Sequence, residues 1–290
     1  MIWLLLSVLS STVIFLLFRM FPKMGVITFP AIVVNYLVAA MCGIVMAGND
    51  YSITDKLEEP WLIGGLSYGV LFISLFYLMA YTSQKIGMSA ASVATKMSLV
   101  IPVAWFMITD VNDEVTLIKV LAVVLAIFGV LFASRRKDEK FNWNLLLFPI
   151  IIFVGSGIID LVIGHFSHGT ALSTQENKYL FTSAPFVTSS FIGGVVLIIR
   201  KSKGLPVFNS KTIIAGAVLG AVNFGSIYFL VRTIDAHLLD RSAIIPINNL
   251  GVVVFSAIAA IIAFRETFSR INILGLALSI SAILLLVFGA

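Results

Sequence analysis

Charged side chains are scarce in this chain. They make up 11% of its 290 residues, whereas 60% of the residues are hydrophobic. Soluble globular domains carry about 25% charged residues. Folded in water, this composition would expose large apolar patches, which promote aggregation. The scarcity of charge therefore excludes a soluble enzyme and a disordered chain, and it indicates a protein embedded in a lipid bilayer.

Side chains that bind metals or form disulfides are also rare. The chain has one cysteine, Cys42, and three histidines. A single cysteine excludes an intramolecular disulfide and a metal site built on several cysteines. His165 and His168 have no credible third ligand and no HExxH pattern around them. No glycine-rich phosphate loop is present either, so we expect no metal, no cofactor, no catalytic residues and no enzymatic activity.

Long apolar runs are abundant. A hydrocarbon core about 30 Å thick requires about 20 apolar residues in a helix that rises 1.5 Å per residue. Cutting the sequence at charges, Pro, Gly and polar clusters predicts ten membrane spans with short connections. These spans are Ile2–Phe21, Thr28–Ala47, Trp61–Thr82, Ala90–Thr109, Thr116–Ser134, Asn144–Phe166, Lys178–Ile199, Thr212–Thr233, Ser242–Phe264 and Ile271–Phe288.

The first five spans and the last five resemble each other. Gly65 and Gly69 in the third span are followed by Tyr77, and Gly216 and Gly220 in the eighth span are followed by Tyr228 at the same offset. Small residues four apart let helices approach closely in lipid. A slightly longer offset aligns Lys96 with Asn249 and Asp113 with Glu266.

A repeat of five spans has a topological consequence. Because five is odd, the second copy must enter the membrane upside down relative to the first, as in many secondary transporters. The sequence therefore predicts an all-α integral membrane protein. Its ten transmembrane helices would form two inverted five-helix repeats, at residues 1–140 and 141–290, which meet at the hydrophilic break 135–140.

The basic residues indicate orientation. Thirteen of the 19 Lys and Arg residues fall on the side reached after the odd-numbered spans, five fall on the other side, and Lys96 lies inside the membrane. Cytoplasmic loops carry the excess of Lys and Arg. We therefore expect a multi-pass protein of the plasma (inner) membrane with both termini outside. On this interpretation the net charge of +5 does not indicate a nucleic-acid partner.

Two charges at membrane depth are the first candidate site residues. An ionised side chain in the middle of a spanning helix costs roughly 2.5–3.5 kcal/mol on insertion scales, so it is expected to have a partner or a role. Lys96 is interpreted as an anchor for an anionic group of a substrate, or alternatively as a structural ion pair. Asp160 is interpreted as a proton-coupling carboxylate or amine binder, or alternatively as a packing residue.

Polar side chains near prolines are the next candidates. Asn248 and Asn249 follow Pro246, which frees a backbone carbonyl, and Pro102 lies similarly in the fourth span. We interpret the two asparagines as cavity-lining residues or as interhelical hydrogen-bonding residues, and the two prolines as hinges. Weaker candidates for substrate or ion binding are Asn35, Asn223, Tyr77 and Tyr228; the two tyrosines alternatively fit interfacial aromatic residues.

Ten spans in two inverted halves with minimal loops resemble the drug/metabolite transporter superfamily, specifically its EamA-type branch. The most specific stretch is Phe264-Arg265-Glu266 followed by Gly275, which is similar to the family pattern of a Glu closing the fourth helix of a repeat. The first half departs from this pattern, because it has Asp113-Glu114 and Ala122 at the positions that correspond to Glu266 and Gly275. The resemblance covers nearly the whole chain.

The resemblance implies a carrier for a small polar metabolite, amino-acid-like or another organic anion or zwitterion, working as an exporter. It also implies a central cavity between the repeats. We expect alternating access at this cavity, with H⁺ as a candidate coupling ion and a monomer or homodimer as the assembly. A lipid flippase or scramblase remains the alternative, and a membrane-embedded enzyme a more distant one.

Overall fold

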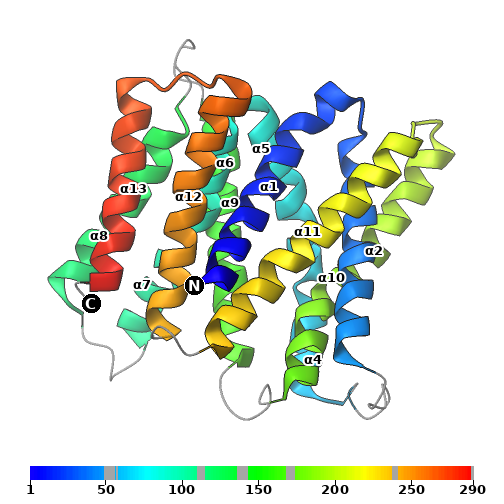
Figure 1. The fold of residues 1–290 in the computed structure, drawn as a ribbon, viewed down its shortest axis with the longest axis horizontal. Helices are drawn as coiled ribbons and strands as arrows, with labels where there is room; N and C mark the ends of the chain where they lie inside the picture. The colour runs from blue at the N-terminus through cyan, green and yellow to red at the C-terminus, as the bar shows by residue number, and fades with distance from the viewer. Residues whose placement is uncertain are drawn as a thin grey trace. The chain divides into compact units, whose positions relative to one another are not determined.

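The computed structural model describes residues 1–48, 56, 58–109, 115–135, 143–167, 174–236 and 241–288. Within these ranges the secondary structure is helical and contains no strands. The helices are α1 (Ile2–Met24), α2 (Thr28–Ala47), α4 (Pro60–Ser67), α5 (Gly69–Lys85), α6 (Met88–Met97), α7 (Val100–Thr109), α8 (Leu117–Ala133), α9 (Trp143–Ser167), α10 (Gln175–Ser202), α11 (Ser210–Asp235), α12 (Arg241–Phe264) and α13 (Arg270–Phe288) (Figure 1).

These helices define a multi-pass α-helical membrane protein. In the described part of the chain, nine helical stretches have at least 18 residues and enough apolar character to cross a bilayer, with α4–α5 and α6–α7 each counted as one stretch. The shorter apolar helix α8 has 17 residues. The helices coincide closely with the spans expected from hydropathy. Because a bilayer leaves no water to satisfy backbone polar groups, an apolar run of this length is stable there chiefly as a helix.

Two of the stretches are interrupted. The fourth stretch stops at Met97 and resumes at Val100, four residues after Lys96. Pro102 explains this break, because it has no N–H to donate to the carbonyl of Ser98; the N–H of Ile101 donates to that carbonyl instead, at 2.9 Å. The third stretch stops at Ser67 and resumes at Gly69, with the buried Tyr68 between them.

Pro246 behaves differently from Pro102. It lies in the sixth position of α12, which continues through it to Phe264. The hydrogen bond that Pro246 lacks would be made to the carbonyl of Ser242, in the first turn of the helix. The backbone of α12 is therefore continuous through Pro246, and the role of Pro246 as a hinge stays a prediction.

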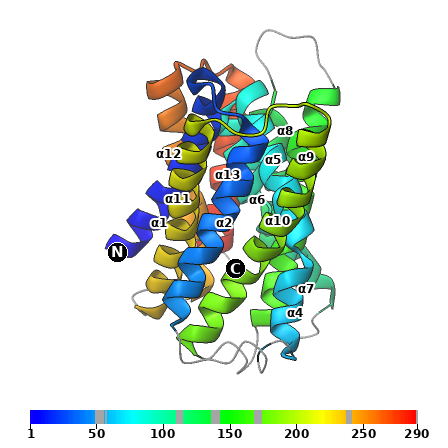
Figure 2. The ribbon, with the colours of Figure 1, turned by 90° about the vertical axis from the view of Figure 1, so that its right-hand side faces the viewer.

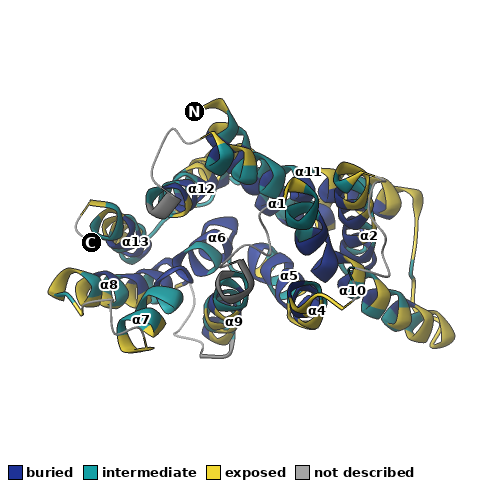
Figure 3. Ribbon diagram, turned by 90° about the horizontal axis from the view of Figure 1, so that it is seen from below, coloured by how far each residue is buried: buried dark blue, intermediate teal, exposed yellow. Residues whose placement is uncertain are grey.

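The chain divides into two compact units, and each is described by itself. The first comprises residues 1–19, 78–160 and 228–290. In it α8 packs along α13, α12 packs on α6 and α13, and α6 contacts α8 (Figure 1). Nearly the whole of α6 is buried, as its dark blue colour shows in Figure 3. This unit therefore places α6, with Lys96 near its end, at the centre of a group of helices.

The second unit comprises residues 20–77 and 161–227. Its main feature is the pair α2 and α10, which lie side by side, and α4 packs on α10 (Figure 2). Tyr36 on α2 is fully buried, stacks on Phe186 of α10 at 5.7 Å between ring centroids, and donates a hydrogen bond to the carbonyl of Phe72 at 2.9 Å. An aromatic cluster thus holds α2, α5 and α10 together.

The glycines predicted to allow helix packing lie at close contacts within the second unit. At each of them a Cβ would overlap atoms of a neighbouring helix. Gly65 and Gly69 lie against α10, whereas Gly216 and Gly220 on α11 lie against α2. The partners are Phe181 and Ala184 for Gly65, Pro185 and Thr188 for Gly69, Ala31 and Val34 for Gly216, and Asn35 and Val38 for Gly220.

Candidate functional site

Lys96 lies in the last turn of α6, immediately before the break in the fourth stretch. Its side chain is half-buried. The negative end of the helix dipole favours a cation at this position. Among the described residues, the Lys96 ammonium group has no hydrogen bond or direct ion pair. The charge of Asp160 acts on it without a direct contact, so its N–H donors can still bind an anionic group.

Asp160 on α9 brings a carboxylate to the same place. The charges of Lys96 and Asp160 interact. The hydroxyl of Ser98, buried in the break between α6 and α7, donates to Asp160 Oδ2 at 2.9 Å. Gly157 permits this approach, because a Cβ there would overlap the side chain of Ile101 on α7.

Ser98 has a second acceptor within reach. Its Oγ lies 2.7 Å from the carbonyl oxygen of Thr95 and 2.9 Å from the Asp160 carboxylate. A hydroxyl carries one proton, so it donates to one of these oxygens at a time. The Thr95 carbonyl at the break and the Asp160 carboxylate on α9 thus compete for the proton of the Ser98 hydroxyl.

The two asparagines on α12 have different roles. Asn249 is 8% exposed and donates from Nδ2 to the backbone carbonyl of Lys96 at 3.2 Å. This carbonyl lies in the last turn of α6, where carbonyls lack partners within the helix. Asn248 is 2% exposed, and its Oδ1 has no hydrogen-bond partner among the described residues. A buried acceptor without a donor costs about 1–3 kcal/mol, so it is a candidate ligand for a bound N–H or O–H group.

Lys96, Asp160, Asn248 and Asn249 therefore belong to one compact unit, on three of its helices. The unit combines a cation, a carboxylate and a buried amide oxygen around an interrupted spanning helix. Such a set has the chemistry to bind a zwitterion or an organic anion. Carboxylate groups pair with ammonium groups, and amide oxygens accept from amines and hydroxyls.

The other predicted residues lie elsewhere. Asn35 and Asn223 face each other in the second unit, where Asn223 Nδ2 donates to Asn35 Oδ1 at 3.2 Å, and both are buried. This contact links α2 and α11 through side-chain amides. The prediction that Asn35 binds substrate or an ion stays a prediction. Tyr77 is 40% exposed and meets Phe29 edge-on. Tyr228 is half-buried beside Phe229, and it belongs to the first unit whereas Tyr77 belongs to the second.

Sequence reasoning missed two functional candidates. Ser98 is not among the residues predicted from the sequence, and its position two residues after Lys96 and four before Pro102 was the available signal. Glu266 was noted for its family pattern; in the structure it accepts from the N–H of Met88 at the start of α6 and pairs with Arg19 at 3.6 Å. Asp113, its proposed counterpart in the first half, lies outside the described residues.

Metal ligation has no support in the described part of the chain, where no three His, Cys, Asp or Glu side chains gather. His168 lies outside the described residues, and the side chain of His165 is not described.

Comparisons with known proteins show a similar fold but do not show a family. No family model matches the chain. A protein of Haemophilus influenzae described as uncharacterized is 25% identical over 291 residues, which cover 97% of this chain and 95% of the other. A solved structure described only as the crystal structure of a protein is similar to this one with a TM-score of 0.56 and 11% identity. It covers 98% of both chains, so the likeness extends over the whole fold.

Proposed function

We propose that this chain is a secondary transporter for a small polar metabolite, an organic anion or zwitterion, which it exports by alternating access. The observation that carries the proposal is the Lys96 ammonium group. It is half-buried at a broken membrane helix, its charge interacts with that of Asp160, and it has no hydrogen bond or direct ion pair among the described residues. Keeping a cation at this depth is costly, and a substrate anion would compensate for that cost.

Matched glycine contacts support an inverted repeat. Residues of α2 face Gly216 and Gly220, and residues of α10 face Gly65 and Gly69. Each of these α10 residues lies 150 positions after its counterpart on α2. The pairs are Ala31 and Phe181, Val34 and Ala184, Asn35 and Pro185, and Val38 and Thr188. The third span (α4–α5) therefore contacts the seventh (α10) in the same way as the eighth span (α11) contacts the second (α2). Two copies related by a two-fold axis would produce this reciprocity.

Helix pairing supports the same arrangement. The helices α2 and α10, α6 and α12, and α8 and α13 pack against each other. Suppose that the protein consists of two five-helix copies, at 1–140 and 141–290. The first pair then joins the second helices of the two copies, the second pair the fourth helices, and the third pair the fifth helices. Asn249 contacts Lys96, the residue at its own repeat position.

On this proposal each side chain has a distinct part. Lys96 attracts the carboxylate or other anionic group of the substrate, and Asn248 accepts a hydrogen bond from its amine or hydroxyl. Asp160 binds the amine of a zwitterion or carries a coupling proton. The breaks at Tyr68 and Ser98 let segments of the third and fourth spans move separately, because broken helices need not move as rigid rods. The carrier would sit in the plasma (inner) membrane with both termini outside.

Transport by purified protein in liposomes tests the proposal. The substrate is found by screening labelled amino acids and small organic acids for uptake, with and without a pH gradient. Lys96→Met keeps the apolar stem and removes the charge, and Asn248→Ala removes the buried acceptor. We expect each to reduce uptake at least tenfold, while the exposed Lys203→Met behaves like the parent.

Two results would overturn the proposal. The first is unchanged uptake by normally folded Lys96→Met and Asn248→Ala proteins. The second is translocation of a fluorescent phospholipid by the parent protein without transport of any solute in the panel, which would favour the flippase alternative.

A further inference from the structure

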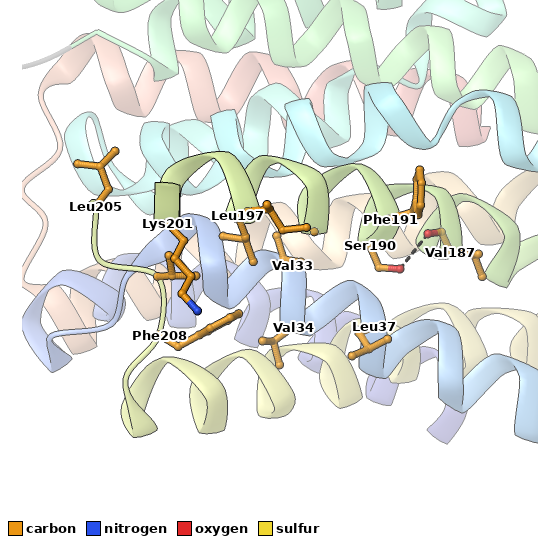
Figure 4. A pocket seen from close by; sticks show the side chains of 13 residues that line it. Val33, Val34, Leu37, Val187, Ser190, Phe191, Leu197, Lys201, Leu205 and Phe208 are labelled. Carbon is orange, nitrogen blue, oxygen red and sulfur yellow. Dashed lines mark hydrogen bonds between the residues drawn. The ribbon is translucent and has the colours of Figure 1, made fainter. Parts of the chain in front are cut away.

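An apolar groove runs along α2 and α10 in the second unit. It has a volume of about 940 Å³. Its walls include Val33, Val34 and Leu37 of α2 and Phe191 and Ile198 of α10, and Lys201 is the basic residue that lines it (Figure 4). Phe191 and Ile198 are 72% and 71% exposed, so this face of the unit looks outward. In a bilayer such a face is covered by lipid or by protein.

The length of the groove matches one leaflet of a bilayer. Its lining on α10 extends from Val187 to Lys201, a rise of about 21 Å at 1.5 Å per residue. A bilayer with its headgroup regions is about 40–45 Å thick, so one leaflet occupies about 20–22 Å. Gly194 lies midway along the lining, and a Cβ there would have no neighbour within 4 Å. The groove is therefore long enough for one lipid and is open at its middle.

The turn after α10 closes one end of the groove. Gly204 adopts a positive φ of 70°, its N–H donates to the carbonyl of Lys201, and the N–H of Leu205 donates to that of Arg200. These two bonds form a Schellman turn, which reverses the chain at a helix end. The turn brings Leu205 and Phe208 into the lining beside Lys201 (Figure 4). The apolar walls thus end at a basic side chain.

The same end of the unit is rich in positive charge. Arg200 precedes Lys201, Lys203 lies two residues after it, and Lys211 is the second residue of α11. Asn209, between them, donates to the carbonyl of Gly25, two residues after Lys23. This end therefore gathers basic residues from α1, α10 and α11. Anionic lipids favour such surfaces, since each Lys or Arg near the headgroups strengthens their binding.

We propose that the groove between α2 and α10 is a binding site for one anionic phospholipid. One of its acyl chains lies between Val34, Leu37 and Phe191, and its phosphate group pairs with Lys201. The site is separate from the Lys96 site and does not depend on the proposed transport. The basic residues that flank Lys201 make an anionic headgroup a better occupant than a neutral one, and the match to one leaflet makes a lipid a better occupant than a second copy of the chain.

Native mass spectrometry of the purified full-length protein tests this site. The protein is titrated with phosphatidylglycerol and, separately, with phosphatidylcholine of the same chains. We expect tighter binding of the first bound phosphatidylglycerol. Lys201→Ala should weaken that binding about fivefold, the contribution of one basic residue near a bilayer surface. The matched control Lys85→Ala, which changes an exposed basic residue of the first unit, should retain the preference.

A second pair of variants tests the apolar part of the groove. Gly194→Leu fills the middle of the groove without meeting other atoms at its Cβ, so the variant should fold normally and lose most binding of both lipids. Gly194→Ala adds one methyl group and should bind like the parent. Equal affinity for the two lipids, equal effects of the two lysine variants, or unchanged binding by Gly194→Leu would each overturn the proposal. A lipid-free dimer that Gly194→Leu dissociates would assign the groove to a second copy instead.

Discussion

Adding one methyl group to Gly220 should weaken the packing of α11 on α2 measurably. A Cβ at Gly220 would lie 2.6 Å from the carbonyl oxygen of Asn35 and 2.8 Å from Cβ of Val38, whereas ordinary contacts begin at about 3.4 Å. The two helices must therefore separate by about 0.8 Å, since neither atom belongs to a flexible side-chain end. Overpacking of this kind costs about 1–3 kcal/mol.

The matched control is Gly194→Ala, which makes the same chemical change in a helix where a Cβ has no neighbour within 4 Å. Both variants gain the higher helix propensity of Ala, up to about 1 kcal/mol, so the difference between them isolates the overpacking. If the halves are equivalent, Gly69→Ala should resemble Gly220→Ala, because its Cβ would lie 2.5 Å from Cβ of Thr188 and 2.9 Å from the carbonyl oxygen of Pro185.

The measurement is the free energy of unfolding in mixed detergent micelles at increasing mole fractions of SDS. We expect Gly220→Ala and Gly69→Ala to unfold earlier than Gly194→Ala by similar amounts. A Gly220→Ala protein as stable as Gly194→Ala would refute the packing argument. A large effect at one glycine and none at the other would refute the equivalence of the two halves.

Two further changes test contacts at other places. Tyr36→Phe keeps the buried ring but removes the hydrogen bond to Phe72, so unfolding in the same micelles should become easier by about 0.5–1.5 kcal/mol; an unchanged midpoint would mean that the hydroxyl contributes nothing. Gly87→Ala forces an L-residue to a φ of 157° and places a Cβ 3.1 Å from Oε2 of Glu266. It should destabilise the start of α6 by about 1–3 kcal/mol, seen as faster amide exchange there, and parent-like exchange would contradict this.

Much of the helical structure was predictable from the sequence, because bilayer thickness imposes a length on each apolar run. The helices α2 and α8 begin and end within a residue of the predicted spans. The break before Val100 also had a local cause in Pro102. The break at Tyr68 had no comparable signal, since Gly69 was interpreted only as a packing residue.

The candidate site was less predictable, because it depends on contacts between distant segments. Lys96 and Asp160 each stood out as charges in apolar runs, but Ser98 reaches Asp160 across 62 positions, and a sequence does not show how α9 packs on α7. The repeat aligned Lys96 with Asn249 without indicating that they touch. The roles of Asn248 and Asn249 separated only when the hydrogen-bond partners of each were known.

The shared proton of Ser98 makes two states of the molecule mutually exclusive. When the hydroxyl donates to the Thr95 carbonyl, this carbonyl in the last turn of α6 has a hydrogen-bond partner, and the Asp160 carboxylate lacks that donor. When it turns to Asp160, the Thr95 carbonyl is released by Ser98. A cation that competes for Oδ2 of Asp160 would weaken its bond with Ser98 and favour the bond from the hydroxyl to the backbone. Occupancy of the carboxylate and the integrity of one helical turn are linked through a single hydrogen atom.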